Sequence, residues 1–190
     1  MNYSELVLVV LILSLIIQAI YLGYFTSRLS FIKDNKQFIS KSVSVIICAK
    51  NEAENLKKNL PKIFNQKYDD FEVIVVNDRS WDNTKEILIN FKDQFTNLKI
   101  VTIPENKNDN FGKKLALTVG IKAAKNNHLI LTDADCYPSS DLWIKEMSQS
   151  FGNEKQIIIG AGIYERENGF LNKIIKYDTS QIAINFMGFA

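Results

Sequence analysis

Two carboxylates separated by a single alanine are the residues best placed to do chemistry. Asp133 and Asp135 follow the apolar run 129–131. Because residues i and i+2 of an extended segment point to the same side, both carboxylates can face one cleft. There they would offer hard oxygen ligands to Mg²⁺ or Mn²⁺, and such an ion could bridge the phosphates of a nucleotide. The alternative is that one of them caps a helix introduced by Pro138 and Ser139.

Two further polar clusters follow apolar, β-branched runs. Asn51 and Glu52 come after residues 43–49, and Asn77 and Asp78 come after residues 71–76. Parallel sheets bind ligands beyond the carboxyl ends of their strands. We therefore expect these two clusters and the two aspartates to converge on one crevice. Each cluster taken alone is also typical of a turn or a helix cap.

The elements that must position these clusters alternate between strand and helix. This alternation predicts βαβ units and an open, mostly parallel sheet flanked by helices. Small residues at 116, 120 and 123 should let one helix lie close to the sheet, and Pro61 should kink or restart another. The predicted strands are residues 43–49, 71–76, 98–103, 129–132 and 156–163, and the predicted helices are residues 53–64, 83–95, 112–124 and 141–151.

The composition is that of a globular protein. Of the 190 residues, 46% are hydrophobic and 23% are charged, and the formal net charge of +2 is too small to indicate a nucleic-acid partner. Cys48 and Cys136 have neither the spacing of zinc ligands nor the density of a disulfide scaffold, which favours a reducing compartment. His128 is the only histidine, so a Ser-His or Cys-His catalytic pair has one possible base.

The amino-terminal segment is typical of a membrane helix. Residues 6–25 form an uncharged run of 20 residues, and at ~1.5 Å per residue a helix of that length spans a bilayer core of ~30 Å. Glu5 precedes the run, whereas a cleavable signal peptide would begin with basic residues. Basic residues, beginning with Arg28, follow the run, so we expect a single-pass anchor with the rest of the chain in the cytoplasm. The predicted organisation is an anchor at 1–27, a juxtamembrane linker at 28–41 and one α/β domain at 42–190.

Four runs together resemble the successive motifs of family 2 glycosyltransferases, which have the GT-A fold. They are residues 43–52 (VSVIICAKNE), 75–84 (VVNDRSWDNT), 112–120 (GKKLALTVG) and 132–135 (TDAD). The resemblance covers about residues 42–165, and the order and spacing of four motifs are more specific than any one of them. Asn77 and Arg79 stand where the commonest family pattern has an aspartate and a glycine.

The resemblance implies a nucleotide-sugar site. Residues at the ends of the first two strands would hold the base and ribose, Lys113 would lie on the nucleotide side, and Asp133 would lie near the ribose or sugar. Asp135 would be the metal residue, with Mg²⁺ or Mn²⁺ as cofactor. The substrate-binding residues implied in this way are Ala49, Asn51, Glu52, Asp78, Lys113 and Asp133.

The implied reaction is metal-dependent transfer of a sugar, with inversion, from a nucleotide sugar to a lipid-linked or polysaccharide acceptor. In the family the catalytic base lies well downstream of the Asp-x-Asp motif, so the catalytic residue is unknown here and we expect the amino-terminal portion of an enzyme. The apolar residues 170–190 would lead toward the membrane, or form a terminal helix packed on the sheet. A catalytically silent, membrane-anchored module that binds a nucleotide sugar or a partner is the alternative function.

Overall fold

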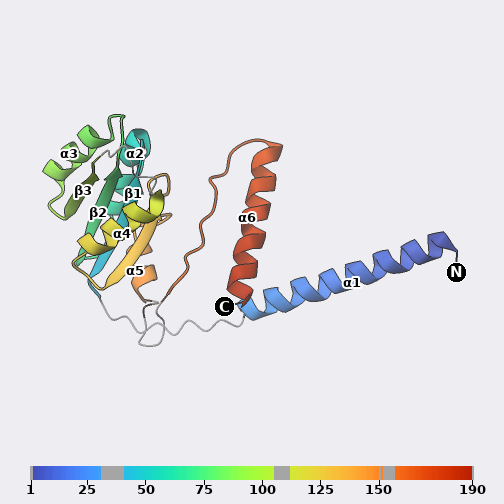
Figure 1. The fold of residues 1–190 in the computed structure, drawn as a ribbon. Coiled ribbons are helices and arrows are strands. Elements are labelled where there is room, and N and C mark those ends of the chain that lie inside the picture. The colour runs from blue at the N-terminus through green and yellow to red at the C-terminus, as the bar shows by residue number, and fades with distance from the viewer. Residues whose placement is uncertain (1, 31–40, 105–111, 150, 152–156, 190) are drawn as a thin grey trace. The chain divides into compact units, whose positions relative to one another are not determined.

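A four-stranded, fully parallel sheet with the order β3-β2-β1-β4 forms the centre of the fold (Figure 1). The computed structural model describes residues 2–30, 41–104, 112–149, 151 and 157–189. The central strand β1 pairs with β2 on one side and with β4 on the other, so that Cys48 lies opposite both Val76 and Asp133. The carboxyl ends of three strands therefore meet at one edge, as the sequence predicts. The strands are β1 (Val43–Ala49), β2 (Phe71–Asp78), β3 (Leu98–Ile103) and β4 (His128–Asp133).

Helices cover both faces of the sheet. The side chains of Val45 and Ile47 pack with those of α2 (Ala53–Phe64), α3 (Thr84–Gln94) and α5 (Trp143–Gln149) on one face. Ile46 packs with α4 (Lys113–Ala123) on the other. The split follows from the strand period of two, which sends odd and even residues of β1 to opposite faces. Because β1 and β2 are covered on both sides, they are apolar nearly throughout.

Gly120 sets how closely α4 approaches the sheet. A β-carbon at this position would lie 2.6 Å from Cγ2 of Ile46 and 3.1 Å from Cγ2 of Val76. Both distances are shorter than an ordinary van der Waals contact, so only glycine fits without a shift of the helix. The small-residue ridge predicted on this helix therefore does allow close packing.

The structure differs from the prediction at two places. Pro61 does not restart the helix, since α2 runs through it to Phe64, because Pro61 lies in the last turn and buried Leu60 and Ile63 hold the helix in place. Residues 157–163 form no strand, although their sequence is β-branched. A strand is stable only when a neighbour pairs with its main chain, and in the described part of the chain β4 pairs with β1 alone. Ile157, Ile159 and Ile163 are accordingly exposed.

The chain divides into two compact units, one containing the sheet with α2–α5 and the other containing α1 (Tyr3–Ser30) and α6 (Phe170–Phe189). α1 continues beyond the predicted end of the apolar run at Phe25, and residues 31–40 of the predicted linker lie outside the described residues. Within its unit, the hydroxyl of Tyr21 on α1 donates a hydrogen bond of 3.0 Å to Oδ1 of Asn185 on α6.

Candidate functional site

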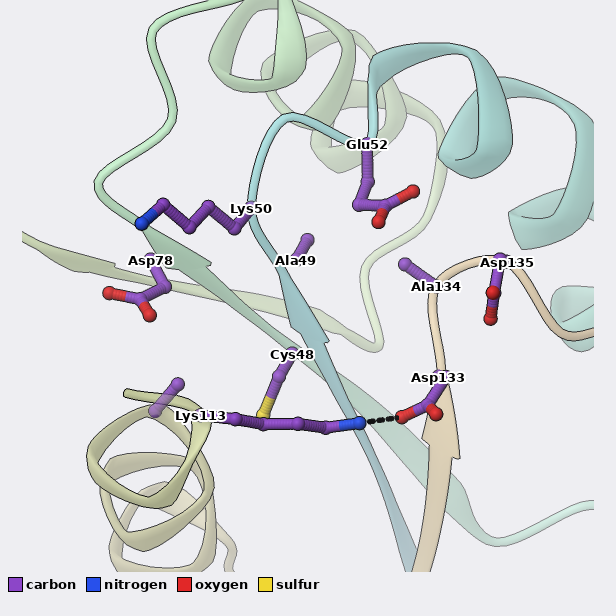
Figure 2. A pocket seen from close by; sticks show the side chains of 10 residues that line it. Cys48, Ala49, Lys50, Glu52, Asp78, Lys113, Asp133, Ala134 and Asp135 are labelled. Atoms are coloured by element: carbon purple, nitrogen blue, oxygen red, sulfur yellow. Dashed lines mark hydrogen bonds and ion pairs between the residues drawn. The ribbon is translucent and has the colours of Figure 1, made fainter. Parts of the chain in front are cut away.

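A cavity of about 250 Å³ lies at the carboxyl ends of β1, β2 and β4 (Figure 2). Parallel strands direct their carboxyl ends to one edge, and α4 closes the cavity from one face of the sheet. Carboxylates, lysines and small side chains line it together. The lining residues are Cys48, Ala49, Lys50, Glu52, Asp78, Lys113, Ala116, Asp133, Ala134 and Asp135.

The cavity brings together six of the seven site residues that the sequence suggested. Ala49, Glu52, Asp78, Lys113, Asp133 and Asp135 all line it. Asn51 is not among the lining residues. It has φ of 58°, in the left-handed region, and its Oδ1 accepts a hydrogen bond of 2.9 Å from the main-chain N–H of Trp81. Asn51 therefore supports the turn, whereas its neighbour Glu52 faces the cavity.

Hydrogen bonds join the loop after β1 to the loop after β2. The N–H of Asn51 donates to Oγ of Ser80 at 2.9 Å, and that of Glu52 donates to Oγ1 of Thr84 at 3.0 Å. Asp82 accepts from the N–H groups of Ala53 and Thr84, both at 3.1 Å. Burial acts to raise the pKa of Asp82, but these hydrogen bonds outweigh it and lower the pKa. The loops thus form one rigid support for the cavity wall.

Asp78 is the most buried carboxylate of the cavity, with 5% of its surface exposed. Its Oδ1 accepts a hydrogen bond of 2.6 Å from Nε of Arg79. Arg79 has φ of 54°, a conformation that costs little for glycine and more for other residues. The ion pair with Asp78 stabilises this conformation at the position where the family pattern has glycine.

Lys113 reaches from the start of α4 to the end of β4. Its Nζ lies 2.5 Å from Oδ1 of Asp133, as the dashed line in Figure 2 shows. The hydrogen bond to Asp133 raises the pKa of Lys113, against the opposing effect of burial. Both side chains are more than half exposed, so this ion pair contributes little to stability and can exchange for a ligand.

The sequence analysis did not identify the thiol of Cys48 as part of this site. In Figure 2 its side chain lies beside that of Lys113. Burial raises the pKa of this thiol, and the charge of Lys113 opposes the shift. The two-residue period of β1 is the signal that could have revealed it, since Cys48 shares the α4 face with Ile46. The sequence analysis also left out Lys50, Ala116 and Ala134.

The turn after β4 carries the two aspartates. The N–H of Cys136 donates to the carbonyl of Asp133 at 3.2 Å, and Oδ1 of Asp135 accepts from the Cys136 thiol at 3.3 Å. α5 begins only at Trp143, and the hydrogen bonds that the aspartates accept come from Lys113 and Cys136. These partners do not support the alternative in which an aspartate caps a helix.

Asp133 and Asp135 fit a divalent cation whose remaining ligands come from a substrate. Among the described residues, no group of three or more His, Cys, Asp or Glu side chains could hold a metal ion without help. Mg²⁺ is commonly bound by one or two carboxylates together with substrate phosphates and water, rather than by a protein cage. Two exposed carboxylates that line one cavity match that pattern.

Comparison with solved structures identifies the architecture of the chain. A mannosyltransferase from Pyrobaculum calidifontis aligns with a TM-score of 0.59 at 23% identity, over 68% of this chain and 39% of that one. The TarS 1–349 structure from S. aureus aligns with a TM-score of 0.51 at 22% identity, over 65% of this chain and 40% of that one. These similarities confirm the predicted fold, a GT-A domain.

Comparison with protein families identifies the family. The family described as "Glycosyl transferase family 2" matches residues 44–187, which is more than half of the chain. The chain belongs to the family 2 glycosyltransferases.

Curated relatives agree with this assignment. A poly-beta-1,6-N-acetyl-D-glucosamine synthase from Staphylococcus epidermidis is 32% identical over 60% of this chain, and the glycosyltransferase AglE from Haloferax volcanii is 33% identical over 67% of it. The matches span 26% and 41% of the lengths of these two relatives. The matched part of the chain thus covers less than half of each relative, which is consistent with the expected amino-terminal portion of an enzyme.

Proposed function

We propose that this chain binds the donor of an inverting glycosyltransferase, with a nucleotide sugar in the cavity and a saccharide or lipid-linked acceptor. The observation that carries the proposal is the convergence of Ala49, Glu52, Asp78, Lys113, Asp133 and Asp135 on one cavity of a family 2 domain. The curated relatives named as poly-beta-1,6-N-acetyl-D-glucosamine synthases support a saccharide product.

In this proposal, the nucleoside and the diphosphate of the nucleotide contact different parts of the cavity. Asp78, Glu52 and the main chain at Ala49 accept hydrogen bonds from the base and ribose. The start of α4 favours the diphosphate, because the unpaired N–H groups of a helix N-terminus and the charge of Lys113 both attract anions. Lys113 then exchanges its contact with Asp133 for a phosphate oxygen.

Asp135, together with Asp133, would hold Mg²⁺ or Mn²⁺ beside the diphosphate. When bound, the cation supplies charge neutralisation to the departing diphosphate. The mannosyltransferase with the same fold was solved with GDP-Man and Mn²⁺, which supports a cation at this place. Asp133 also lies nearest to the ribose or sugar, as the family resemblance implies.

The transfer itself forms one bond and breaks another. The acceptor hydroxyl oxygen bonds to the anomeric carbon while the bond from that carbon to the diphosphate oxygen breaks, which inverts the configuration. The hydroxyl proton goes to a carboxylate base. We assign no residue of this chain to that role.

We further propose that α1 anchors the enzyme in a membrane. Residues 3–24 form a helix with a mean hydropathy of 2.7 in its most apolar window, long and apolar enough to cross a bilayer. Its apolar side chains from Leu6 to Leu22 are exposed all around the helix, and such a helix is suited to lipid. With no basic residue before it and several after it, the catalytic domain faces the cytoplasm.

Titration of UDP and GDP with and without Mn²⁺ tests the donor site. We expect Mn²⁺ to raise the affinity of the wild-type protein for one of these nucleotides, and Asp135→Asn to abolish that gain because it removes the charge and keeps the shape. Asp133→Asn should lower affinity and retain part of the gain. If neither nucleotide binds, or if both variants bind as the wild type does, the proposal fails.

A further inference from the structure

α2 and the segment that follows it contact the loop between β4 and α5 at three points. Asn59 donates from Nδ2 to the carbonyl of Ala134 at 3.0 Å, and Nζ of Lys62 lies 3.2 Å from the ring centroid of Tyr137. Gln66 donates from Nε2 to the carbonyl of Ser140 at 2.8 Å. Asn59 and Lys62 are three residues apart, which places them along one side of α2, whereas Gln66 follows the end of that helix at Phe64. The loop is therefore held at its start by α2 and at its end by the segment that follows α2.

The first of these contacts reaches the turn that carries the two aspartates. Ala134 lies between Asp133 and Asp135 and is 4% exposed, and Figure 2 shows it on the turn that leads from one aspartate to the other. A buried carbonyl without a donor is costly, so the bond from Asn59 restricts the positions that this turn can take. A rotation of the Ala134 peptide would redirect both neighbouring carboxylates.

Burial of Asn59 costs free energy that packing alone does not require. It is 3% exposed, and its Oδ1 is buried with no hydrogen-bond partner among the described residues. A leucine of similar size would avoid that unsatisfied acceptor and would suit the apolar surroundings of Leu56, Leu60 and Ile63. The amide is thus useful mainly for the hydrogen bond that it donates to Ala134.

We propose that Asn59 is a positioning residue for the donor site, acting through the main chain of Ala134 to set where Asp133 and Asp135 point. This inference rests on the proposed function, because it concerns the cation and diphosphate that those carboxylates would hold. Partners that orient metal ligands commonly change metal affinity by about 10–100-fold when they are lost. Asn59 would be such a partner without touching the ligand.

Gln66 offers a matched control. It lies two residues beyond the end of α2, is 7% exposed, and also bonds the main chain after β4, where its Oε1 accepts from the N–H of Ile144 on α5 at 3.1 Å. Its contacts lie at Ser140 and Ile144, beyond the turn with the aspartates. Loss of Gln66 should therefore weaken the fold without redirecting Asp133 and Asp135.

The experiment compares Asn59→Leu and Gln66→Leu in the full chain. Affinity for UDP or GDP is measured by calorimetry with and without Mn²⁺, and thermal unfolding is recorded for each protein. We expect Asn59→Leu to lose about tenfold or more of the Mn²⁺-dependent gain in affinity and to keep its metal-free affinity within about twofold. Gln66→Leu should lower the unfolding temperature and retain the gain.

A second variant tests the inference if Asn59→Leu folds poorly. Asn59→Ala removes the donor and leaves room for water, and the same selective loss of the Mn²⁺-dependent gain is expected from it. The inference is overturned if the gain survives in both Asn59 variants, or if Gln66→Leu loses it equally. Absence of nucleotide binding, or of any Mn²⁺ effect, in the wild-type protein would instead refute the proposed function and this inference with it.

Discussion

At the scale of single residues, Asp78 combines burial with a charge and lies in the cavity wall. Its carboxylate is 5% exposed and is paired with Arg79, so the buried group has a partner. A polar group of a ligand placed against Asp78 meets an acceptor that is already held in position. Such preorganised acceptors lose little conformational freedom when the ligand binds.

Replacement of Asp78 tests its role in nucleotide binding. Asp78→Ala should weaken the binding of UDP or GDP by about 1–3 kcal/mol, the usual effect of removing one partner of a buried polar contact. Isothermal titration calorimetry measures the change. Asp141→Ala is the control, since Asp141 pairs with Lys67 on the surface and does not line the cavity. Equal affinities of the wild type and Asp78→Ala would leave Asp78 as a turn residue only.

The residues that the sequence predicted and those that it missed differ in how far along the chain their positions are determined. Asp78 and Asp133 are the last residues of β2 and β4, and Glu52 lies three residues beyond β1, so local sequence is enough to place them at the sheet edge. The two-residue period of β1 turns Cys48 toward α4, but its position opposite Asp133 depends on the register of β1 against β4. Asn59 does not line the cavity and supports it through the packing of α2 on the turn after β4. No local pattern reports these two long-range contacts.

At the scale of elements, the distance between α4 and the sheet determines the width of the cavity. Lys113 and Ala116 on α4 line one side, and the strands supply the other. Gly120 lies one turn beyond Ala116 and contacts Ile46 and Val76. Any group added at Gly120 must therefore move the whole helix or distort β1.

Gly120→Ala tests this dependence. Overpacking should cost about 1–3 kcal/mol, more than the gain of up to about 1 kcal/mol from the higher helix propensity of alanine. We expect a lower free energy of unfolding in urea and weaker nucleotide binding. Gly162→Ala is the control, because no atom lies within 4 Å of an added β-carbon there and Gly162 does not line the cavity. Wild-type stability and affinity in Gly120→Ala would show that α4 is free to move.

The element boundaries show where sequence patterns stop being informative. Strands β1 to β4 were predicted within two residues of their observed ends, because apolar, β-branched runs between polar turns mark buried strands. The same kind of run at residues 157–163 is not a strand, since strand formation depends on a pairing neighbour. Pro61 shows the converse, because tertiary packing maintains a helix that local rules would interrupt.

At the scale of the whole molecule, the two compact units have different surfaces. The unit with the sheet has an apolar interior, whereas α1 exposes apolar side chains along most of its length. Exposed apolar surface of that extent indicates a lipid or protein partner. The positive residues after α1 predict the side of the membrane on which the catalytic domain lies.

Protease protection tests this topology. A protease added to intact cells should leave residues 42–190 uncut, because the basic residues that follow α1 retain the domain in the cytoplasm. Permeabilised cells provide the control, in which the same protease should reach the domain. Efficient cleavage from outside intact cells would reverse the orientation, and a mature protein that lacks residues 1–27 would identify α1 as a cleaved signal.

The pairing of β4 on the far side of β1 has a consequence for synthesis on the ribosome. β1, β2 and β3 can pair while the nascent chain is still short, but β1 keeps an open edge until β4 emerges. Until then, Asp133 and Asp135 are missing and the cavity is incomplete. A nucleotide therefore cannot stabilise the nascent chain by binding to it. During that interval the main-chain groups on the β4 side of β1 are open to pairing with other chains, and only rapid arrival of β4 or a chaperone protects them.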